Sequence, residues 1–244
     1  LETEGLSWDS TLNQIKQSFT VQNGERFTGL GHGDRGRATT LDLAGTEVVR
    51  EYGPQSMLVV PYYLSGEFTD ADIELLEQAM SEWEAVAHVS FVEVSPRAGV
   101  YNIIKVNKNT WSSSIGENNS NCEMIFGTGG NAYSHVLHEL GHALGLLHEH
   151  QRPDRDSFVK INFFNIIAQY IINFEVKDNP LYTEEEFEYD YSSIMHYPQA
   201  SFSKDGSSPT IESLDEDQPI NRLGIITPTD ALKVREIYGP PEEE

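Results

Sequence analysis

"HVLHELGHALGLLHEH" is the sequence of residues 135–150, and it contains five of the eight histidines in this chain of 244 residues. If its first ten residues form an α-helix, with 100° per residue, then His138, Glu139 and His142 share one face and the leucines share the opposite face. His138 and His142 are one turn apart, so both imidazoles can bind one metal ion. The leucine face is predicted to pack on the protein core.

A third histidine can join this site only if the helix ends before it. His148 is ten residues after His138, which on a straight helix is a distance of about 15 Å along the axis. Gly145 is placed to end the helix, because glycine accepts the positive φ that is typical of helix C-termini. The spacing therefore predicts a break at Gly145 that returns His148 to the same ion.

The three histidines predict a catalytic zinc site. Three neutral imidazoles leave a fourth position of Zn²⁺ open for water, and the ion lowers the pKa of that water and polarises a bound carbonyl group. Glu139 lies on the same side of the helix and is long enough to accept the proton of the water. We therefore expect one Zn²⁺ per chain and attack of water on an acyl carbon.

The alternative is an amphipathic helix with surface histidines. His-Glu-x-x-His alone is a short pattern, but its extension through Gly145 to His148 is much harder to obtain by chance. For His135 and His150 we expect places beside the ligands or on the surface, not metal binding.

Composition excludes several classes of protein. The chain has 16 Lys and Arg against 39 Asp and Glu, a formal net charge of −23, which would repel nucleic acid and anionic lipid. No apolar run approaches the roughly 20 residues that span a bilayer. The one cysteine, Cys122, cannot form an intramolecular disulfide, and residues 1–10 do not have the pattern of a signal peptide.

Strands are predicted mainly in the first half of the chain and helices later, the order of an α+β domain. A strand is expected at residues 58–64, where Pro61 favours a sheet edge or a bulge. Thr69 is placed to cap a long helix, and Thr227 to cap the last helix, which Gly239 ends. Further expected elements are strands within residues 39–45, 46–53, 89–94 and 101–106, helices at 13–19 and 161–174, and a loop at 29–37.

The extended zinc motif resembles that of the metzincin endopeptidases, and Glu149, directly after the third histidine, resembles the astacin family among them. An adamalysin-type metzincin would have aspartate at this place, which disfavours another branch. The resemblance covers roughly residues 57–239. The other segments that carry it are "HEHQRPDRDSFVKI" (148–161), "YDYSSIMHY" (189–197), "SFSKDGSSPTI" (201–211) and "LKVREIYG" (232–239).

This resemblance implies a two-lobed α+β catalytic domain over residues 57–239, followed by an acidic tail at 240–244. The N-terminal lobe would contain a twisted, mostly parallel five-stranded sheet and two long helices. The irregular C-terminal lobe would carry a methionine turn and the C-terminal helix. A protein or peptide substrate would lie extended in the cleft between the lobes and pair with an edge strand. We expect a monomer that inserts into no membrane.

The resemblance also implies roles for single residues of a zinc endopeptidase. Glu139 would be the general base. Tyr197 would be a fifth zinc ligand in the resting enzyme and would then donate a hydrogen bond to the oxyanion; the alternative is a buried aromatic ring. Met195 would pack beneath the metal, and Glu149 would pair with the N-terminus of the mature enzyme.

Substrate contacts are expected at three further residues. Trp111 and Ser112 match the family's edge strand by order and spacing, although Trp111 fits the core equally well. Lys204 is near the place where family members present basic groups to the first primed subsite, so it would favour an acidic residue after the cut. A solvated surface lysine is the alternative.

Residues 1–56 are either an inhibitory propeptide or a retained extension. The family's propeptide places an aspartate, within Phe-x-Gly-Asp, on the zinc in place of water. This chain has Phe27-Thr28-Gly29 and Gly33-Asp34 but not the contiguous motif. Asp34 is the candidate for a displaced latency switch, with Arg35 or Arg37 as the cutting point. We favour an extension that packs on the upper lobe.

The chain departs from most animal astacins in its cysteines, since those proteins carry disulfides. This departure suggests a bacterial-type member, and it removes the disulfides as an argument for an oxidising compartment. We nevertheless expect a secreted or exported protein. A binding module that keeps the metzincin scaffold without catalysis is the alternative in another class of function. The intact Glu139 and zinc ligands speak against it.

Overall fold

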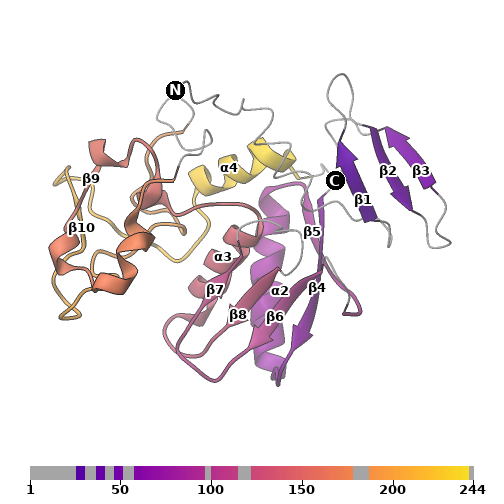
Figure 1. The fold of residues 1–244 in the computed structure, drawn as a ribbon, viewed down its shortest axis with the longest axis horizontal. Coiled ribbons are helices and arrows are strands. Elements are labelled where there is room, and N and C mark those ends of the chain that lie inside the picture. The colour runs from indigo at the N-terminus through magenta and orange to yellow at the C-terminus, as the bar shows by residue number, and fades with distance from the viewer. Residues whose placement is uncertain are drawn as a thin grey trace. The chain divides into compact units, whose positions relative to one another are not determined.

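A computed structural model describes residues 26–30, 37–41, 47–51, 58–96, 100–114, 122–177 and 187–241. Three short strands, β1 (Arg26–Leu30), β2 (Arg37–Leu41) and β3 (Glu47–Glu51), form an antiparallel sheet in the order β1-β2-β3 (Figure 1). β2 and β3 overlap the two strands expected from the sequence. The loop expected at residues 29–37 is wrong at both ends, because Gly29 and Leu30 belong to β1 and Arg37 belongs to β2. Its remaining residues, which include Asp34, and the helix expected at residues 13–19 lie outside the described residues.

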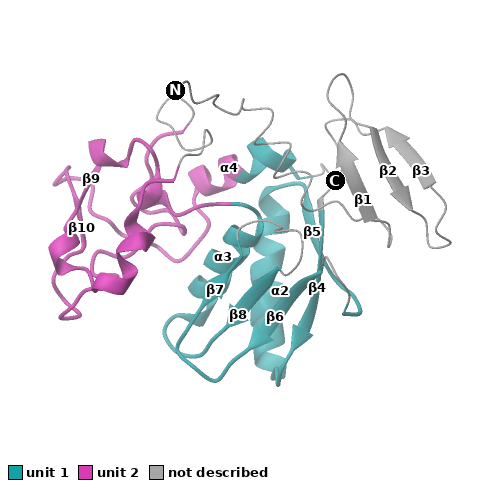
Figure 2. Cartoon of the chain, in the orientation of Figure 1, with its two compact units in different colours: residues 1–145, 234–244 teal, residues 146–233 magenta. Residues whose placement is uncertain are grey.

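The chain divides into two units, which Figure 2 shows in different colours. The first unit comprises residues 1–145 and 234–244, and the second comprises residues 146–233.

The first unit contains a five-stranded sheet in the order β5-β4-β6-β8-β7. The first four of these strands are parallel, and β7 runs antiparallel to β8 at the edge. The mostly parallel sheet expected from the resemblance is therefore confirmed. The strands are β4 (Leu58–Ser65), β5 (Val89–Glu93), β6 (Tyr101–Lys105), β7 (Ser112–Ser113) and β8 (Glu123–Phe126).

The sheet edge or bulge expected at Pro61 is not found: β4 lies between β5 and β6, and its pairing with β5 runs through Pro61 without a shift of register. β4 pairs with β5 through residues 58–62 and with β6 only through residues 62–65. Pro61 therefore lies where β4 has β5 as its one partner. A proline is tolerated there because its missing N–H is not needed by a second neighbouring strand.

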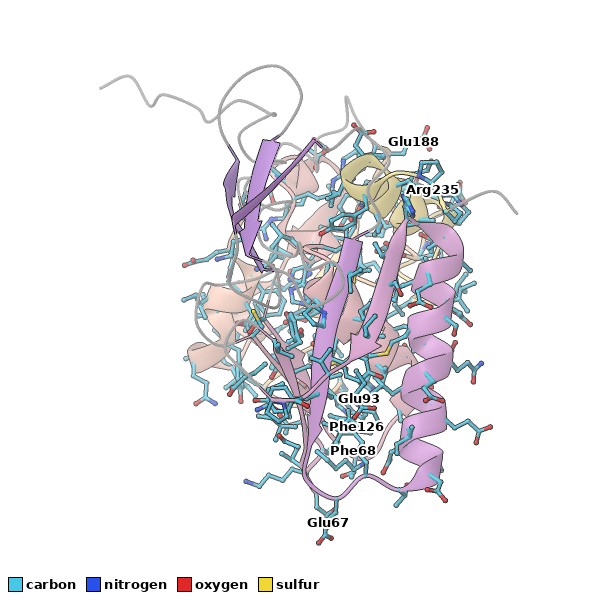
Figure 3. The ribbon with its side chains drawn as sticks, turned by 90° about the vertical axis from the view of Figure 1, so that its right-hand side faces the viewer. Glu67, Phe68, Glu93, Phe126, Glu188 and Arg235 are labelled. Carbon is cyan, nitrogen blue, oxygen red and sulfur yellow. The ribbon has the colours of Figure 1, made fainter. Side chains whose placement is uncertain are left out.

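Helix α2 (Asp70–Val86) crosses between β4 and β5 and covers one face of the sheet (Figure 3). It begins as the sequence predicts: the Thr69 side chain accepts a hydrogen bond from the Asp72 N–H, and the Asp72 carboxylate accepts one from the Thr69 N–H at 3.0 Å. This reciprocal pairing satisfies two backbone donors at the start of the helix. The core-facing side of α2 includes Leu76, Met80 and Trp83, all buried.

Two contacts fix the ends of this layer. Trp83 Nε1 donates a hydrogen bond to the carbonyl oxygen of Leu137 at 3.1 Å, so α2 is attached to α3 (Ala132–Ala143). Figure 3 labels Phe68 and Phe126, whose ring centroids are 5.3 Å apart in an edge-on arrangement. Such aromatic pairs add to the stability gained from burial alone.

The second unit has little regular structure. β9 (Val159–Ile161) pairs antiparallel with β10 (Ile211–Ser213), and the remaining described elements before α4 are short 3₁₀ helices. Its core consists of Val159, Ile166, Phe174, Tyr189 and Ile211, all buried. The 3₁₀ helices are η1 (Glu149–Gln151), η2 (Arg155–Ser157), η3 (Phe163–Asn165) and η4 (Ala168–Phe174).

The α-helix predicted at residues 161–174 is wrong. Ile161 belongs to β9, Ile166 forms an isolated bridge with Ser203, and only short 3₁₀ turns lie around them. The apolar residues of this stretch do not form one buried stripe either, since Phe164 is 88% exposed. A high apolar content over fourteen residues was mistaken for helical periodicity.

The last helix, α4 (Pro228–Tyr238), has the predicted ends. Asp230 N–H donates to Thr227 Oγ1 at 3.1 Å, and Gly239 has φ +89° directly after the helix. Its residues up to 233 belong to the second unit and the rest to the first. In the part of the chain that the structure describes, no helix is both long and apolar enough to cross a membrane.

Replacing Thr69 by alanine should lower the free energy of unfolding by about 1 kcal/mol, because the first turn of α2 loses its side-chain acceptor. Thr69→Ser keeps the hydroxyl and serves as the matched control. Urea unfolding followed by circular dichroism measures both variants. Equal stability of the alanine and serine variants would show that the cap contributes nothing.

Candidate metal centre

Helix α3 carries the first part of the site. The Asn131 side chain caps its N-terminus by accepting a hydrogen bond from Ser134 N–H at 3.3 Å. His138, Glu139 and His142 are all buried on this helix, and the rings of the two histidines lie edge-on with centroids 4.7 Å apart. One turn of helix therefore holds two imidazoles beside each other, as the i, i+4 spacing predicts.

The chain turns at Gly145. Helix α3 ends at Ala143, and Gly145 adopts φ +93° while its N–H donates to the carbonyl oxygen of His142 at 2.8 Å. This is the left-handed conformation that glycine adopts at low cost. The helix thus ends where the sequence predicts a break, three residues before His148.

His138, His142 and His148 meet at one place. Each offers one ligand atom, and these atoms all lie within 4.8 Å of one another. Imidazole nitrogens bound to one tetrahedral Zn²⁺ at 2.0–2.1 Å are separated by roughly 3.4 Å. The arrangement therefore fits a zinc ion after at most a small closing movement of the side chains, and neutral nitrogen donors suit this metal.

Gln151 orients the third ligand. His148 Nδ1 lies 3.1 Å from Gln151 Oε1, so a proton on Nδ1 is donated to the amide and Nε2 is left to bind metal. The amide nitrogen of Gln151 in turn donates to the carbonyl oxygen of Asn173 at 3.1 Å. Sequence analysis missed Gln151; the one signal for it was its place three residues after a predicted ligand.

Tyr197 lies against the same histidine. Its ring centroid is 4.3 Å from that of His148, and it stacks on His150 at 4.2 Å. His150 is fully buried, and burial, the largest cause, lowers its pKa well below the ordinary value. A neutral His150 packed under Tyr197 is consistent with the expectation that it lies beside the ligands and does not bind metal.

Met195 is buried in the turn that precedes Tyr197. Two hydrogen bonds to the Asp230 carboxylate hold this turn, one from Ser193 Oγ at 2.6 Å and one from Ile194 N–H at 2.9 Å. The carbonyl oxygen of Met195 accepts the N–H of Glu149 at 3.1 Å. The methionine turn is thus attached both to α4 and to the residue next to His148.

The Glu149 carboxylate is fully buried and has three donors. Oε1 accepts from Arg152 Nη1 at 3.0 Å and from Asp190 N–H at 3.1 Å, and Oε2 accepts from Lys233 Nζ at 2.5 Å. Burial raises the pKa of Glu149, but the Lys233 ammonium and the Arg152 guanidinium outweigh it and hold the pKa below its ordinary value. Pairing of Glu149 with the N-terminus of the mature enzyme, which the resemblance implies, stays a prediction.

The residues expected to bind substrate lie on the edge of the sheet and on the surface. Ser112 is in the edge strand β7, opposite Ile125. Trp111 stacks on His135 with centroids 5.1 Å apart and lies at the same distance from Phe126. Among the described residues its buried indole Nε1 has no hydrogen-bond partner.

Lys204 is exposed. Its Nζ donates to the carbonyl oxygen of Phe164 at 2.6 Å and lies 4.9 Å from the centroid of that ring. Asp34 lies outside the described residues, so its relation to the metal centre stays a prediction.

Several curated proteins are similar to this chain, and some of them are named zinc metalloproteinases. High choriolytic enzyme 1 of Oryzias latipes is 34% identical over 187 residues, which are 75% of this chain and 67% of that protein. High choriolytic enzyme 2 of the same fish is 40% identical over 60% of this chain and 51% of its own length. Zinc metalloproteinase nas-6 of Caenorhabditis elegans is 31% identical over 74% of this chain. The chain spans about half to two thirds of these relatives.

A solved structure has the same fold. The structure of high choriolytic enzyme 1, described as a hatching enzyme zinc-protease, aligns with a TM-score of 0.66 at 32% sequence identity. The alignment covers 75% of this chain and 90% of that one.

Gly145→Ala should weaken zinc binding about tenfold or more, because relaxing the positive φ moves His148 away from the other two ligands. Gly206→Ala is the matched control: Gly206 also has a positive φ, and an added Cβ would meet nothing within 4 Å. Both variants should lose about 1–2 kcal/mol of stability. Chelator competition measures the affinity, and equal zinc affinity in the two variants would contradict the role of Gly145.

The astacin family model, which describes a peptidase family, matches residues 52–239, well over half of the chain. These residues include all three histidines that the structure brings together. The chain therefore belongs to the astacin family of zinc-dependent metalloendopeptidases.

Proposed function

We propose that this chain cleaves protein substrates with Glu139 as general base and with His138, His142 and His148 as the zinc ligands. The observation that carries the proposal is the convergence of the three ligand atoms within 4.8 Å of one another. Glu139 is buried in the same helical turn, between two of the ligands in the sequence.

Glu139 moves the proton in this mechanism. Zn²⁺, when bound, supplies Lewis-acid activation of the water and of the scissile carbonyl. The Glu139 carboxylate accepts a proton as the water oxygen bonds to the carbonyl carbon, and it then donates that proton to the leaving amine as the C–N bond breaks. A buried carboxylate suits this role, because a low dielectric strengthens its interaction with the proton it transfers.

Tyr197 is assigned a second role in catalysis. In the resting enzyme its phenol would be a further zinc ligand, and with substrate bound it would donate a hydrogen bond to the carbonyl oxygen as negative charge develops there. The packing of its ring on His148, with centroids 4.3 Å apart, supports a place at the metal centre. We propose that three further residues support the zinc ligands structurally: Gly145, Glu149 and Met195.

The substrate is proposed to add a strand to the edge of the sheet at β7. A short edge strand leaves backbone donors and acceptors for an extended peptide, and Trp111 and Ser112 lie at that edge. We propose that Lys204 makes the enzyme prefer substrates with an acidic residue directly after the cleaved bond. Its ammonium group is exposed and fixed by Phe164, which supports a contact with a substrate carboxylate.

We further propose that the enzyme is secreted or exported, acts as a monomer and keeps residues 1–56 as an extension. Asp34 is the residue that would make the extension inhibitory, if it binds zinc in place of water.

Glu139→Gln should retain zinc and lose peptidase activity by roughly 10²–10⁴-fold, because the amide cannot accept the proton of the water. Cleavage of casein and zinc content by atomic absorption are measured on the same sample. The matched control is Glu123→Gln, which changes an exposed glutamate on β8. His142→Ala should lose both zinc and activity.

Substantial proteolysis by Glu139→Gln would overturn the role of this carboxylate. Proteolysis by zinc-free His142→Ala would overturn the zinc mechanism itself.

Incubation of the purified chain with a peptide library should leave its own N-terminus and its activity unchanged, because we assign residues 1–56 as a retained extension. Acidic residues should be enriched directly after the cut, and this enrichment should disappear in Lys204→Gln. Mass spectrometry reads the cleaved peptides and the N-terminus together.

Loss of residues 1–56 together with a rise in activity would show instead that they are an inhibitory propeptide. An increase in the activity of the intact chain on Asp34→Ala would identify the latency switch.

A further inference from the structure

Lys233 is a buried cation that the proposed mechanism does not use. The residue is 1% exposed on α4, and its Nζ lies 2.5 Å from Oε2 of the fully buried Glu149, 84 residues away in the sequence. Removing two charges from water costs free energy that their mutual attraction often fails to repay. Such a pair is weak evidence for stability alone and is better explained by a role in fixing one conformation.

Lys233 is one of the cations that contact Glu149. Arg152 also contacts Glu149, but its guanidinium is divided among several acceptors: the Asp154 carboxylate at 2.7 and 2.8 Å and the carbonyl oxygens of Phe187 and Glu188. The Lys233 ammonium lies 2.5 Å from the Glu149 carboxylate, and its charge also favours the charged form of Asp230, three residues earlier on α4. Loss of the Lys233 ammonium would therefore leave Oε2 of a buried carboxylate without this charge.

Glu149 transmits this contact to the metal centre. It directly follows the zinc ligand His148, and its N–H donates to the carbonyl oxygen of Met195 at 3.1 Å. Its Oε1 accepts the N–H of Asp190, five residues before Met195. A shift of the Glu149 side chain would therefore move the third ligand and the methionine turn together.

One turn of α4 holds both of these segments. Asp230 accepts hydrogen bonds from Ser193 Oγ and Ile194 N–H next to Met195, and Lys233, three residues later on the same face, holds Glu149 next to His148. The two α4 residues thus set the position of Met195 relative to that of His148.

We propose that Lys233 is a positioning residue of the zinc site, which acts through Glu149 to hold His148 and the methionine turn in register. This inference rests on the proposed function for its catalytic consequence, but its effect on metal binding is independent of catalysis. In this proposal Lys233 contributes to the geometry of the site and not to the chemistry.

Lys233→Met in the full chain tests the proposal, because methionine keeps an unbranched side chain of nearly the same length and removes the charge. We expect zinc affinity to fall about 10–100-fold, the range for groups that orient metal ligands. The visible spectrum of the Co²⁺-substituted protein should change, since it reports ligand geometry. The kcat for a peptide substrate should fall while KM changes little.

The matched control is Lys160→Met. Lys160 also pairs with a glutamate, at 3.5 Å from Glu212, but its side chain is 63% exposed and the pair lies on β9 and β10. This variant should have the zinc affinity, cobalt spectrum and kcat of the unaltered chain.

A double variant, Glu149→Gln with Lys233→Met, covers the case in which Lys233→Met fails to fold. It removes both members of the Lys233–Glu149 pair, and the Asp230 carboxylate keeps its hydrogen bonds from Ser193, Ile194 and Thr227. The double variant should therefore be folded by circular dichroism and still bind zinc more weakly than the unaltered chain. Unaltered zinc affinity and cobalt spectrum in either folded variant would overturn the proposal. If the unaltered chain binds zinc but cleaves no peptide, the proposed function fails while the metal measurements still decide the role of Lys233.

Discussion

The metal centre depends on one backbone turn. A single α-helix can present two imidazoles to one ion, but a third that follows in the same helix is carried away along the axis. Gly145, with φ +93°, ends α3 directly after the second ligand, and His148 then lies with its ligand atom within 4.8 Å of the others. The hydrogen bonds and ion pairs around the site stabilise the ligand geometry that this turn creates.

These stabilising contacts are made by buried polar groups near the ligands and not by the ligands alone. Gln151 sets the protonation of the His148 ring, and Glu149 ties the neighbouring backbone to Met195. Burying a polar group costs free energy unless the group is paired. These networks therefore fix one conformation only when every buried group in them has a partner. Lys233 and Arg152 complete the network around Glu149 with cations from within the fold.

Local signals predicted much of the fold and of the candidate site. The zinc ligands follow from a helical repeat and one glycine, and the caps at Thr69 and Thr227 follow from a side chain placed next to its own backbone donors. These features depend on a few adjacent residues, which a sequence displays directly. The parallel sheet came from the family resemblance, and it was confirmed.

Features set by distant residues were missed. The strand pairing around Pro61 depends on where β6 begins, and the bridge from Ile166 to Ser203 depends on a segment 37 residues away. Lys233 reads as an ordinary lysine in an amphipathic helix, because its partner is 84 residues earlier. Gln151 was missed for another reason. Several donors and acceptors lie close to it in the sequence, and only the folded structure shows that its amide bonds to His148.

The bond from the Trp83 indole to Leu137 has a consequence for protein engineering. Leu137 immediately precedes the first ligand, so the helix that presents the metal is anchored through a side chain that no zinc-binding signature contains. A graft of the histidine motif onto another scaffold would copy the donors without this anchor. The smallest segment set that transfers this metal centre to another protein should therefore include α2, which carries Trp83.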